Sequence, residues 1–226
     1  MKILNSPLRR ALGAFTLIEL LVVIAIIALL AGIAVPVYTT AMLTAQMNAA
    51  AQNARHIGLA LHLYAGDNNG QFPNGTNSYG ETINTSNDAF RSLFPNYVDN
   101  EQIFVVARSI DGPKADNNMN GASQILKAGE NHFAYVSGIN SSSSSWWPVI
   151  ADSTDGSGYY TKTETAAGGT WKGGKAVVVR VDDSAAVLAL SGPDTKRFVP
   201  LPEDTSKNLL DTSYIGTGAK LLEPAH

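Results

Sequence analysis

Oxygen-bearing side chains recur at every second position in one polar segment of the chain, which is the spacing found in calcium-binding loops. The segment supplies three such side chains and then a glycine suited to a sharp turn: Asp116, Asn118, Asn120 and Gly121. The twelfth position holds Lys127, where an EF-hand requires glutamate, so the standard loop is excluded. Glu130 is the acid that would substitute in a looser site. We therefore consider a structural calcium site here, with simple Asx turns as the alternative.

Two further acidic pairs offer the same chemistry, whereas signatures of catalysis are missing from the sequence. These pairs are Asp152 with Asp155 and Asp182 with Asp183. The chain contains no cysteine, which excludes disulfides, cysteine metal sites and thiol catalysis. No nucleophile elbow, phosphate loop or zinc signature occurs. We expect no catalytic residues, no certain cofactor and no enzymatic activity.

Glu19 is the most unusual residue, because it interrupts the apolar run from Phe15 to Val35. A carboxylate near the middle of a membrane helix costs about 2.5–3.5 kcal/mol on insertion scales, and less near an end. No lysine or arginine follows it within one or two helical turns. We therefore expect that its partner comes from elsewhere or that the acid stays protonated.

The apolar run that carries Glu19 is long enough to span a membrane, which needs about 20 helical residues. Lys2, Arg9 and Arg10 precede it, and such charges stay in the cytoplasm, so the C-terminus is sent outward. Three interpretations compete. An uncleaved signal anchor would let Glu19 reach the interface. A secretory signal peptide conflicts with the internal acid and with Pro36 just after the apolar run. The third interpretation is a prepilin.

The stretch Gly13-Ala14-Phe15-Thr16-Leu17-Ile18-Glu19-Leu20-Leu21-Val22-Val23-Ile24-Ala25-Ile26-Ile27-Ala28 closely resembles the processing site of type IV pilins and type II secretion pseudopilins. The resemblance implies that a prepilin peptidase cuts between Ala14 and Phe15 and methylates the new amine. Glu19 then becomes the fifth mature residue, and Pro36 falls where the family commonly has a helix-kinking proline. Ala14 departs from the pattern, because the residue before the cut is normally glycine.

The resemblance also implies partners and a location. Glu19 of one subunit would neutralise the Phe15 amine of a neighbour, so the chain would assemble with itself into a helical filament. Other implied partners are the prepilin peptidase, the secretion or pilus assembly platform and the inner membrane. The chain would be a single-pass protein of the cytoplasmic membrane, with its globular head in the periplasm or in an extracellular filament. Major pseudopilins often carry a structural calcium in a C-terminal loop.

The remaining sequence predicts an α+β fold of pilin-like type. We expect a leader at 1–14, a helix at 15–65 whose first part, 15–35, spans the membrane, and a head at 66–226. Pro36 predicts a kink or local unwinding from Gly32 to Pro36. The second half of the helix is amphipathic, and its face from Ile57 to Tyr64 should pack on a small antiparallel sheet. The run from Gly66 to Gly70 is a strong stop signal.

Short apolar runs separated by polar loops predict the elements of the head. A short helix is expected from Asp88 to Leu93. The expected strands are Gln102–Ala107, His132–Val136, Val149–Ala151, Lys175–Val181, Ala185–Leu190 and Arg197–Leu201, the fourth and fifth forming a hairpin. Features of this region, such as the Gly173-Gly174 pair, resemble pseudopilin-like proteins of Planctomycetes and Verrucomicrobia. Trp146 and Trp147 are expected in the core, or else as an exposed contact for a partner or a glycan.

The leading functional hypothesis is a structural subunit of a type II secretion pseudopilus. The absence of cysteine favours this over a type IV pilus subunit for adhesion or motility, since many such pilins close a C-terminal loop with a disulfide. A membrane-tethered periplasmic binding protein or enzyme is the alternative from another class. The net charge of −3, without a basic stripe after the N-terminus, argues against nucleic acid as a partner.

Overall fold

The computed structural model describes residues 16–109 and 115–225. The chain divides into two compact units, Met1–Met42 and Leu43–His226, and the boundary falls within one long helix. This helix, α1 (Leu17–Asp67), continues through Pro36 without interruption. The local unwinding considered for Gly32–Pro36 is therefore wrong. The hydroxyl groups of Thr39 and Thr40 both donate to the Pro36 carbonyl, at 2.9 and 3.0 Å.

Within the second unit, α1 buries one face in the main core. The buried side chains are small or aliphatic and recur at helical spacing: Met47, Ala50, Ala54, Ile57, Ala60, Leu61 and Ala65. The helix ends where the sequence predicts, because Asn69 and Gly70 adopt positive φ and the Gly70 amide donates to the Ala65 carbonyl at 2.7 Å. The amphipathic half of the predicted helix is thus confirmed as a core element.

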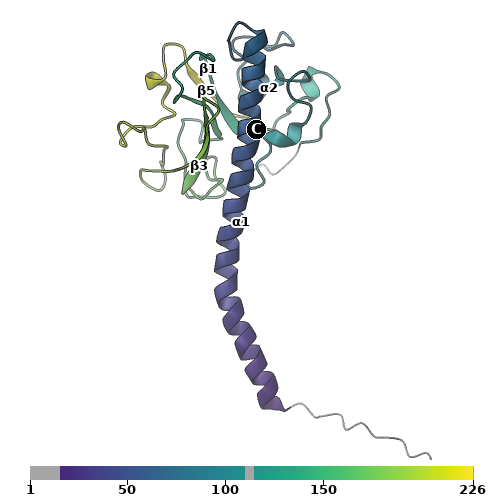
Figure 1. Cartoon of the computed structure of the whole chain (residues 1–226), viewed down its shortest axis with the longest axis vertical. Coiled ribbons are helices and arrows are strands. Elements are labelled where there is room, and N and C mark those ends of the chain that lie inside the picture. Colours follow the sequence, from purple (N-terminus) through teal and green to yellow (C-terminus); the bar gives the residue numbers. More distant parts are fainter. Residues whose placement is uncertain (1–15, 110–114, 226) are drawn as a thin grey trace, which may run out of the picture. The chain divides into compact units, whose positions relative to one another are not determined.

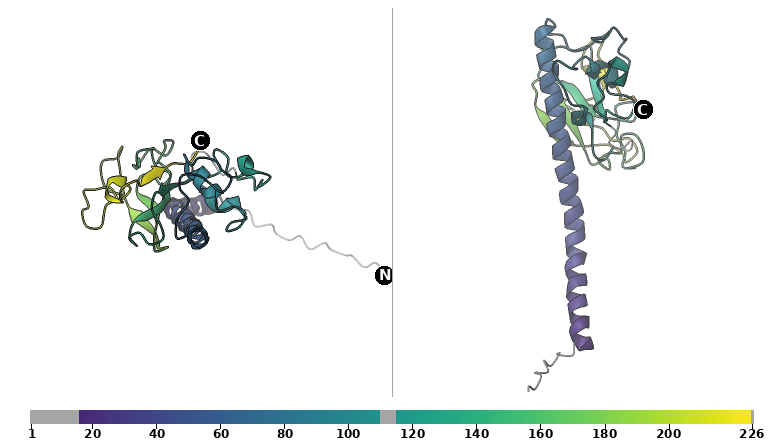
Figure 2. Two further views of the ribbon diagram at one scale, coloured as in Figure 1. Left: turned by 90° about the horizontal axis from the view of Figure 1, so that it is seen from above. Right: turned by 90° about the vertical axis from the view of Figure 1, so that its right-hand side faces the viewer.

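A five-stranded antiparallel sheet lies along this half of α1 (Figures 1 and 2). Its strands are β1 (Phe133–Ser137), β2 (Pro148–Asp152), β3 (Lys175–Arg180), β4 (Ala185–Ala189) and β5 (Lys220–Leu222). Their order across the sheet is β4-β3-β2-β1-β5, and each neighbouring pair is antiparallel. The α+β fold of a long N-terminal helix on an antiparallel sheet is therefore confirmed.

Both faces of the sheet are covered. Successive side chains of a strand point to opposite faces, so Val177 and Val179 join the core beneath α1, while Ala176 and Val178 join a second apolar cluster. Side chains from the segments around residues 160 and 199–210 complete this second cluster. Trp147 packs against the main core and Trp146 against the second cluster, and both are partly buried. The central strands are consequently apolar on both sides.

Short helices connect the sheet to the remainder of the head. They are α2 (Ser86–Arg91) and the 3₁₀ helices η1 (Glu101–Phe104), η2 (Ala122–Gln124) and η3 (Thr212–Tyr214). The predicted short helix, the predicted hairpin and the strands near 133 and 149 are confirmed.

Two predicted strands are wrong. The run 102–107 begins as η1, because the Asn100 side chain caps a 3₁₀ turn by accepting from the Gln102 amide at 2.8 Å. The run 197–201 makes only isolated bridges.

Candidate functional site

The N-terminus of α1 is closed by a capping box formed by Thr16 and Glu19. Glu19 Oε2 accepts hydrogen bonds from the Thr16 backbone amide at 2.9 Å and from its hydroxyl at 2.7 Å. The Glu19 amide donates in return to the Thr16 hydroxyl at 3.3 Å. Reciprocal bonds of this kind satisfy backbone groups that have no partner inside the helix. Glu19 therefore has a partner in its own helix, which the sequence analysis did not anticipate.

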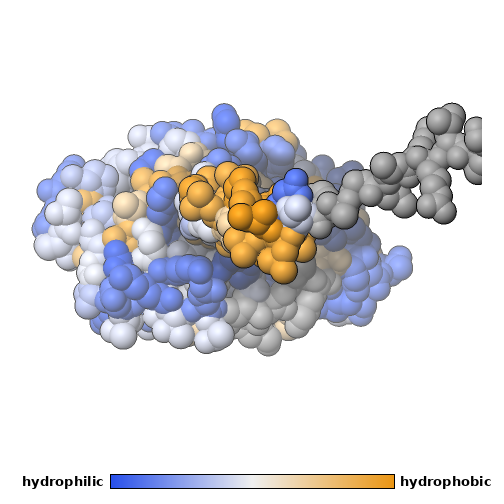
Figure 3. Space-filling model, turned by 90° about the horizontal axis from the view of Figure 1, so that it is seen from below, coloured by the Kyte–Doolittle hydropathy of each residue, from blue (hydrophilic) through white to orange (hydrophobic). Residues whose placement is uncertain are grey.

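The segment that follows Glu19 is uniformly apolar and exposed. An 18-residue window of α1 has a mean hydropathy of 3.1 and none of it is buried, so this helix is long and apolar enough to cross a membrane. Figure 3 shows its apolar residues as a continuous orange surface. Ile18, Val22 and Val23 flank the carboxylate directly. The residues expected at the cleavage site, Gly13, Ala14 and Phe15, lie outside the described residues.

A cluster of three carboxylates is the main polar feature of the head. Oxygen atoms of Glu101, Asp116 and Glu130 all lie within 4.8 Å of one another. Glu101 and Glu130 are buried, whereas Asp116 is exposed. Among the described residues, this is the one group of three acids or histidines close enough to hold a metal ion. Asp116 and Glu130 were expected from the sequence, whereas Glu101 was not, because it lies 15 positions before Asp116 and directly precedes the run Gln102–Ala107 that was predicted as a strand.

Lys127 is the cation that faces this cluster. Its Nζ atom lies 2.6 Å from Asp116 Oδ2 and 3.8 Å from Glu130 Oε1. The hydrogen bond from Lys127 lowers the pKa of the Asp116 carboxyl, and the same contact raises the pKa of Lys127. Burial raises the pKa of Glu130, and the nearby charge of Glu101 raises it further. Negative charge in the cluster is therefore only partly compensated.

Asn118 and Asn120, the other two expected calcium ligands, lie in a series of turns after Asp116. The Asn118 amide donates to Asp116 Oδ1 at 2.8 Å, and the Asn120 amide donates to Asn118 Oδ1 at 3.3 Å. The Asn118 side-chain nitrogen donates to Gln124 at 3.3 Å. These are Asx turns of the kind that such residues favour. Asp116 thus belongs to the acidic cluster, whereas the Asn118 amide donates to Asp116 and stabilises the loop.

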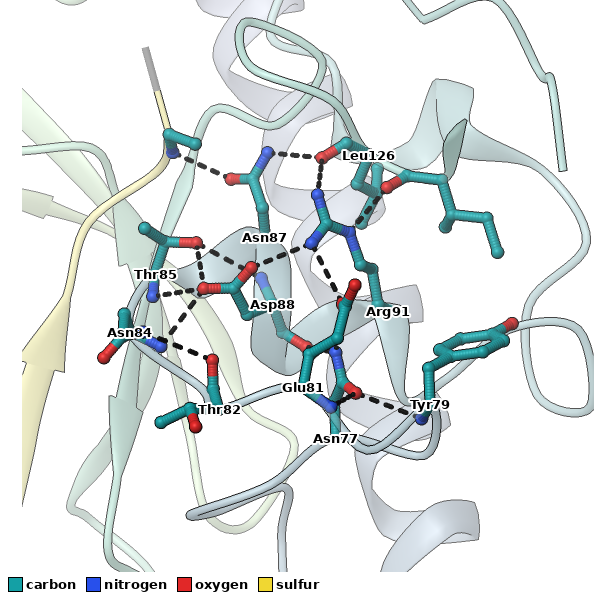
Figure 4. Close-up of polar contacts among 12 residues, drawn as sticks. Asn77, Tyr79, Glu81, Thr82, Asn84, Thr85, Asn87, Asp88, Arg91 and Leu126 are labelled. Atoms are coloured by element: carbon teal, nitrogen blue, oxygen red, sulfur yellow. Dashed lines mark hydrogen bonds and ion pairs between the residues drawn. The ribbon is translucent and has the colours of Figure 1, made fainter. Parts of the chain in front are cut away.

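A network of polar contacts from α2 holds the backbone beside the cluster (Figure 4). The Asn87 side chain donates to the carbonyls of Leu126 and Lys127, at 2.7 and 3.0 Å. Arg91 Nε donates to the Ile125 carbonyl at 2.8 Å, and its Nη1 atom pairs with Asp88 at 2.9 Å. The carbonyl groups of residues 125–127 therefore face α2.

The amide groups of the same segment face the carboxylates. The Leu126 amide donates to Glu101 Oε1 at 2.8 Å, and the Lys127 amide donates to Glu130 Oε2 at 2.6 Å. The Glu101 amide itself donates to the Asn117 side chain at 2.9 Å, which connects η1 to the loop that carries Asp116. Both buried carboxylates therefore accept hydrogen bonds from a backbone segment whose carbonyl groups are bound by side chains of α2.

The other acidic pairs do not form comparable clusters. Asp152 is buried, and its Oδ2 atom accepts from Trp171 Nε1 at 2.7 Å and from the Val177 amide at 2.6 Å. Burial raises the pKa of Asp152 to about 7. Asp155 instead shapes a turn by accepting from the Ser157 amide at 2.8 Å.

The second pair lies in the turn between β3 and β4. Asp182 accepts from the Ser184 amide at 3.0 Å, and Asp183 lies 3.5 Å from His62 of α1. Asp182 therefore stabilises the hairpin turn, and Asp183 connects that turn to α1.

Comparison with known proteins gives one finding. Residues 9–35 match the family described as the prokaryotic N-terminal methylation motif. No curated protein and no solved structure matches the chain. The chain therefore carries the prepilin-type signal that is characteristic of type IV pilins and pseudopilins. Among the described residues, one helix is long and apolar enough to cross a membrane, and together with the motif it supports processing by prepilin peptidase and filament assembly in general.

Proposed function

We propose that the protein is a structural subunit of a type II secretion pseudopilus. Prepilin peptidase removes residues 1–14 and methylates the Phe15 amine, and mature subunits then assemble through their N-terminal helices. The methylation motif at residues 9–35 is the observation that carries the proposal. It is supported by the exposed apolar segment of α1, which would be costly to leave in water and suits both membrane storage and packing against other subunits.

The charges before the helix support one orientation. Lys2, Arg9 and Arg10 precede the apolar segment without any acid, and basic residues are retained on the cytoplasmic side. The head, which includes the second half of α1, would then lie in the periplasm or on an extracellular filament. The cleavage site between Ala14 and Phe15 would then lie at the cytoplasmic face of the membrane, where the peptidase cuts.

Glu19 is proposed to guide docking of each new subunit. Cleavage gives Phe15 a positively charged amine, and Glu19 of a neighbouring subunit would neutralise it. The attraction between opposite charges is stronger in a medium of low dielectric constant, and an unpaired charge there is strongly unfavourable. Glu19 would therefore select one register between subunits. The capping box supports this role, because it fixes the carboxylate at the first turn of α1.

A type IV pilus subunit for adhesion or motility is the closest alternative. The absence of cysteine favours the pseudopilus, because a disulfide commonly closes a C-terminal loop in type IV pilins. Electron microscopy of material sheared from the cell surface separates the two. Long extracellular fibres composed of this chain would contradict a periplasmic pseudopilus.

A membrane-tethered periplasmic binding protein or enzyme is the alternative from a different class. Such a protein would use the prepilin-type segment only as an anchor, so its activity would survive a change that blocks assembly. Replacing Glu19 by alanine distinguishes the two. A filament subunit would lose assembly while its head stays folded.

The first test is the N-terminal residue and the intact mass of the mature protein isolated from its own membranes. A start at Phe15 with the added mass of one methyl group is the expected result. A start at Met1 or near Val35 would remove the free Phe15 amine that Glu19 is proposed to meet. The assembly mechanism would then be wrong.

A further inference from the structure

We propose that Glu101, Asp116 and Glu130 bind a calcium ion in the head. This site is independent of the proposed role in a filament. It lies before β1, among elements that α2 holds, and it uses a ligand set different from the alternating pattern that the sequence displays. Three features of the structure support a bound ion: the spacing of the three carboxylates, one carboxylate oxygen without a partner among the described residues, and a surrounding backbone held by hydrogen bonds.

The spacing of the carboxylates suits a single calcium ion. Calcium is bound by oxygen atoms at about 2.3–2.6 Å, so two ligands on opposite sides of the ion lie about 5 Å apart. One carboxylate oxygen from each of Glu101, Asp116 and Glu130 lies within 4.8 Å of the other two. All three ligands are carboxylates, and the chain has no cysteine to favour a softer metal. Exposure of Asp116 leaves the ion access to water, which would complete its coordination.

Glu101 supplies the observation that points to a ligand. Its side chain is completely buried, and its Oε1 atom accepts from the Leu126 amide. Its Oε2 atom has no hydrogen-bond partner among the described residues. Placing a carboxylate oxygen away from water without a partner is unfavourable, and bound cations are one way in which proteins compensate it. A calcium ion between Glu101 and Glu130 would provide this compensation.

Lys127 acts as the competing cation. Its ammonium group contacts Asp116 at 2.6 Å but lies 3.8 Å from Glu130, and it carries one charge against three carboxylates. A divalent ion compensates more of this negative charge than the ammonium group does. Calcium binding would therefore release the Lys127 side chain to solvent, which is feasible because this side chain is already partly exposed.

The backbone around the cluster is organised before the ion binds. The segment 125–127 is held on one side by Asn87 and Arg91 (Figure 4). On the other side, its amides donate to the two buried carboxylates. Rigid placement of ligands reduces the ordering cost of binding. Bound calcium would connect η1, the loop at Asp116 and the turn at Glu130, so it should stabilise the head.

The test uses the full chain in detergent micelles after treatment with EDTA and dialysis. Calorimetric titration with calcium chloride is expected to show one site with a Kd of about 10⁻⁴–10⁻³ M, the range of extracellular calcium modules. Thermal unfolding, followed by tryptophan fluorescence, should shift to higher temperature as calcium is added. Wild-type protein that shows neither binding nor this shift at ~10 mM calcium, well above that range, would overturn the proposal.

Asp116→Asn is the main variant, because the residue is exposed and asparagine retains the turn to the Asn118 amide. It should weaken calcium binding at least about tenfold, since affinity follows ligand charge. Glu101→Gln should do the same if it folds. Glu203→Gln, an exposed acid outside the cluster, is the matched control and should bind calcium like the wild type. Equal calcium affinities of the Asp116→Asn and Glu203→Gln variants would show that Asp116 is not a calcium ligand, and the proposed site would be wrong.

Lys127→Met provides a second, opposite readout. Removing the competing ammonium group should lower the melting temperature without calcium, because three carboxylates then lack their cation. The same change should increase both the calcium affinity and the calcium-induced rise in melting temperature. A decrease in calcium affinity in Lys127→Met would contradict the proposed competition.

Discussion

At the scale of single residues, Glu19 has two roles, one in the helix cap and one proposed in subunit docking, and different substitutions can separate them. Its Oε2 atom completes the capping box with Thr16, and its charge is proposed to meet the amine of a neighbouring subunit. A glutamine at the same position retains an oxygen acceptor for the capping box but carries no charge. Conversely, valine in place of Thr16 removes the hydroxyl of the capping box and leaves the Glu19 charge intact. The two changes therefore test the cap and the charge independently.

The first prediction is that Glu19→Gln blocks filament assembly whereas Thr16→Val permits it. Loss of one partner from a buried ion pair costs about 3–5 kcal/mol, while loss of a cap costs about 1 kcal/mol. The measurement is the fraction of subunits recovered in sheared filaments relative to membranes. Intact masses must show that both variants are processed. Normal assembly of Glu19→Gln would mean that the charge is dispensable and that Glu19 serves the helix cap.

Asp152 leads to a prediction about pH. Its pKa is about 7 in the folded chain because of burial, and it returns to about 4 in the unfolded chain. Between these pH values the folded state holds a proton that the unfolded state has lost, so this group makes the protein less stable as pH rises from about 4 to about 7. Above about 7 the penalty is constant, and it amounts to at most about 4 kcal/mol.

Asp152→Asn, which cannot ionise, should remove this contribution. We expect the stability of the variant relative to the wild type to improve as pH rises from 4 to 7 and then to level off. Urea unfolding of both proteins at several pH values measures the difference. A difference that does not change with pH would show that folding does not raise the pKa of Asp152.

Sequence patterns identify some of these residues and miss others for physical reasons. Glu19 is conspicuous because a charge interrupts an apolar run, and the spacing of Thr16 and Glu19 is a known capping signature that could have been used. Glu101 gave no comparable signal. It is separated from Asp116 by 15 positions, and only the folded backbone brings the two carboxylates together.

At the scale of elements, the close approach of α1 to the sheet depends on Gly58. A Cβ atom at this position would lie 3.1 Å from both Val179 Cγ1 and Asp183 Oδ1. Such contacts are too short for a larger side chain unless the helix or the hairpin moves. Gly66 lies in the same helix, where a Cβ atom would meet nothing within 4 Å.

We predict that Gly58→Leu destabilises the head by about 1–3 kcal/mol, as overpacking of a core typically does. Gly66→Leu is the matched control and should be neutral or slightly stabilising, because leucine favours helix more than glycine does. Urea unfolding measures both variants. Equal stabilities would indicate that the packing between α1 and the β3–β4 hairpin adapts without cost.

The same scale shows which elements the sequence could predict. The long helix and the β3–β4 hairpin have strong periodic patterns and clear turn signals, and both are present. The run at 102–107 is rich in residues that favour strands, but an Asn100 cap and burial of Phe104 form a 3₁₀ turn instead. β5 has three residues, too few to produce a pattern, and it is defined by its pairing with β1.

At the scale of the whole molecule, the helix belongs to both compact units. Its first part carries the apolar surface and the methylation motif, and its second part supplies one wall of the core of the head. The sequence predicts that the head begins at residue 66, where the helix was expected to have ended. In the structure, the compact unit that contains the sheet begins at Leu43, inside the helix. The difference matters because the helical residues in between include Ile57 and Leu61, which are fully buried.

The last prediction concerns two truncated chains that both lack the membrane segment. The fragment 43–226 should be soluble and unfold cooperatively, whereas the fragment 66–226 should aggregate or remain partly unfolded. Burial of side chains such as Ile57 and Leu61 contributes about 1.5–3 kcal/mol each, and a domain of this size has a total stability of about 5–15 kcal/mol. Removing the whole helical wall therefore exceeds that margin. Urea unfolding and the dispersion of NMR signals measure the outcome, and a well-folded 66–226 fragment would show that the sheet and its loops form a sufficient core without α1.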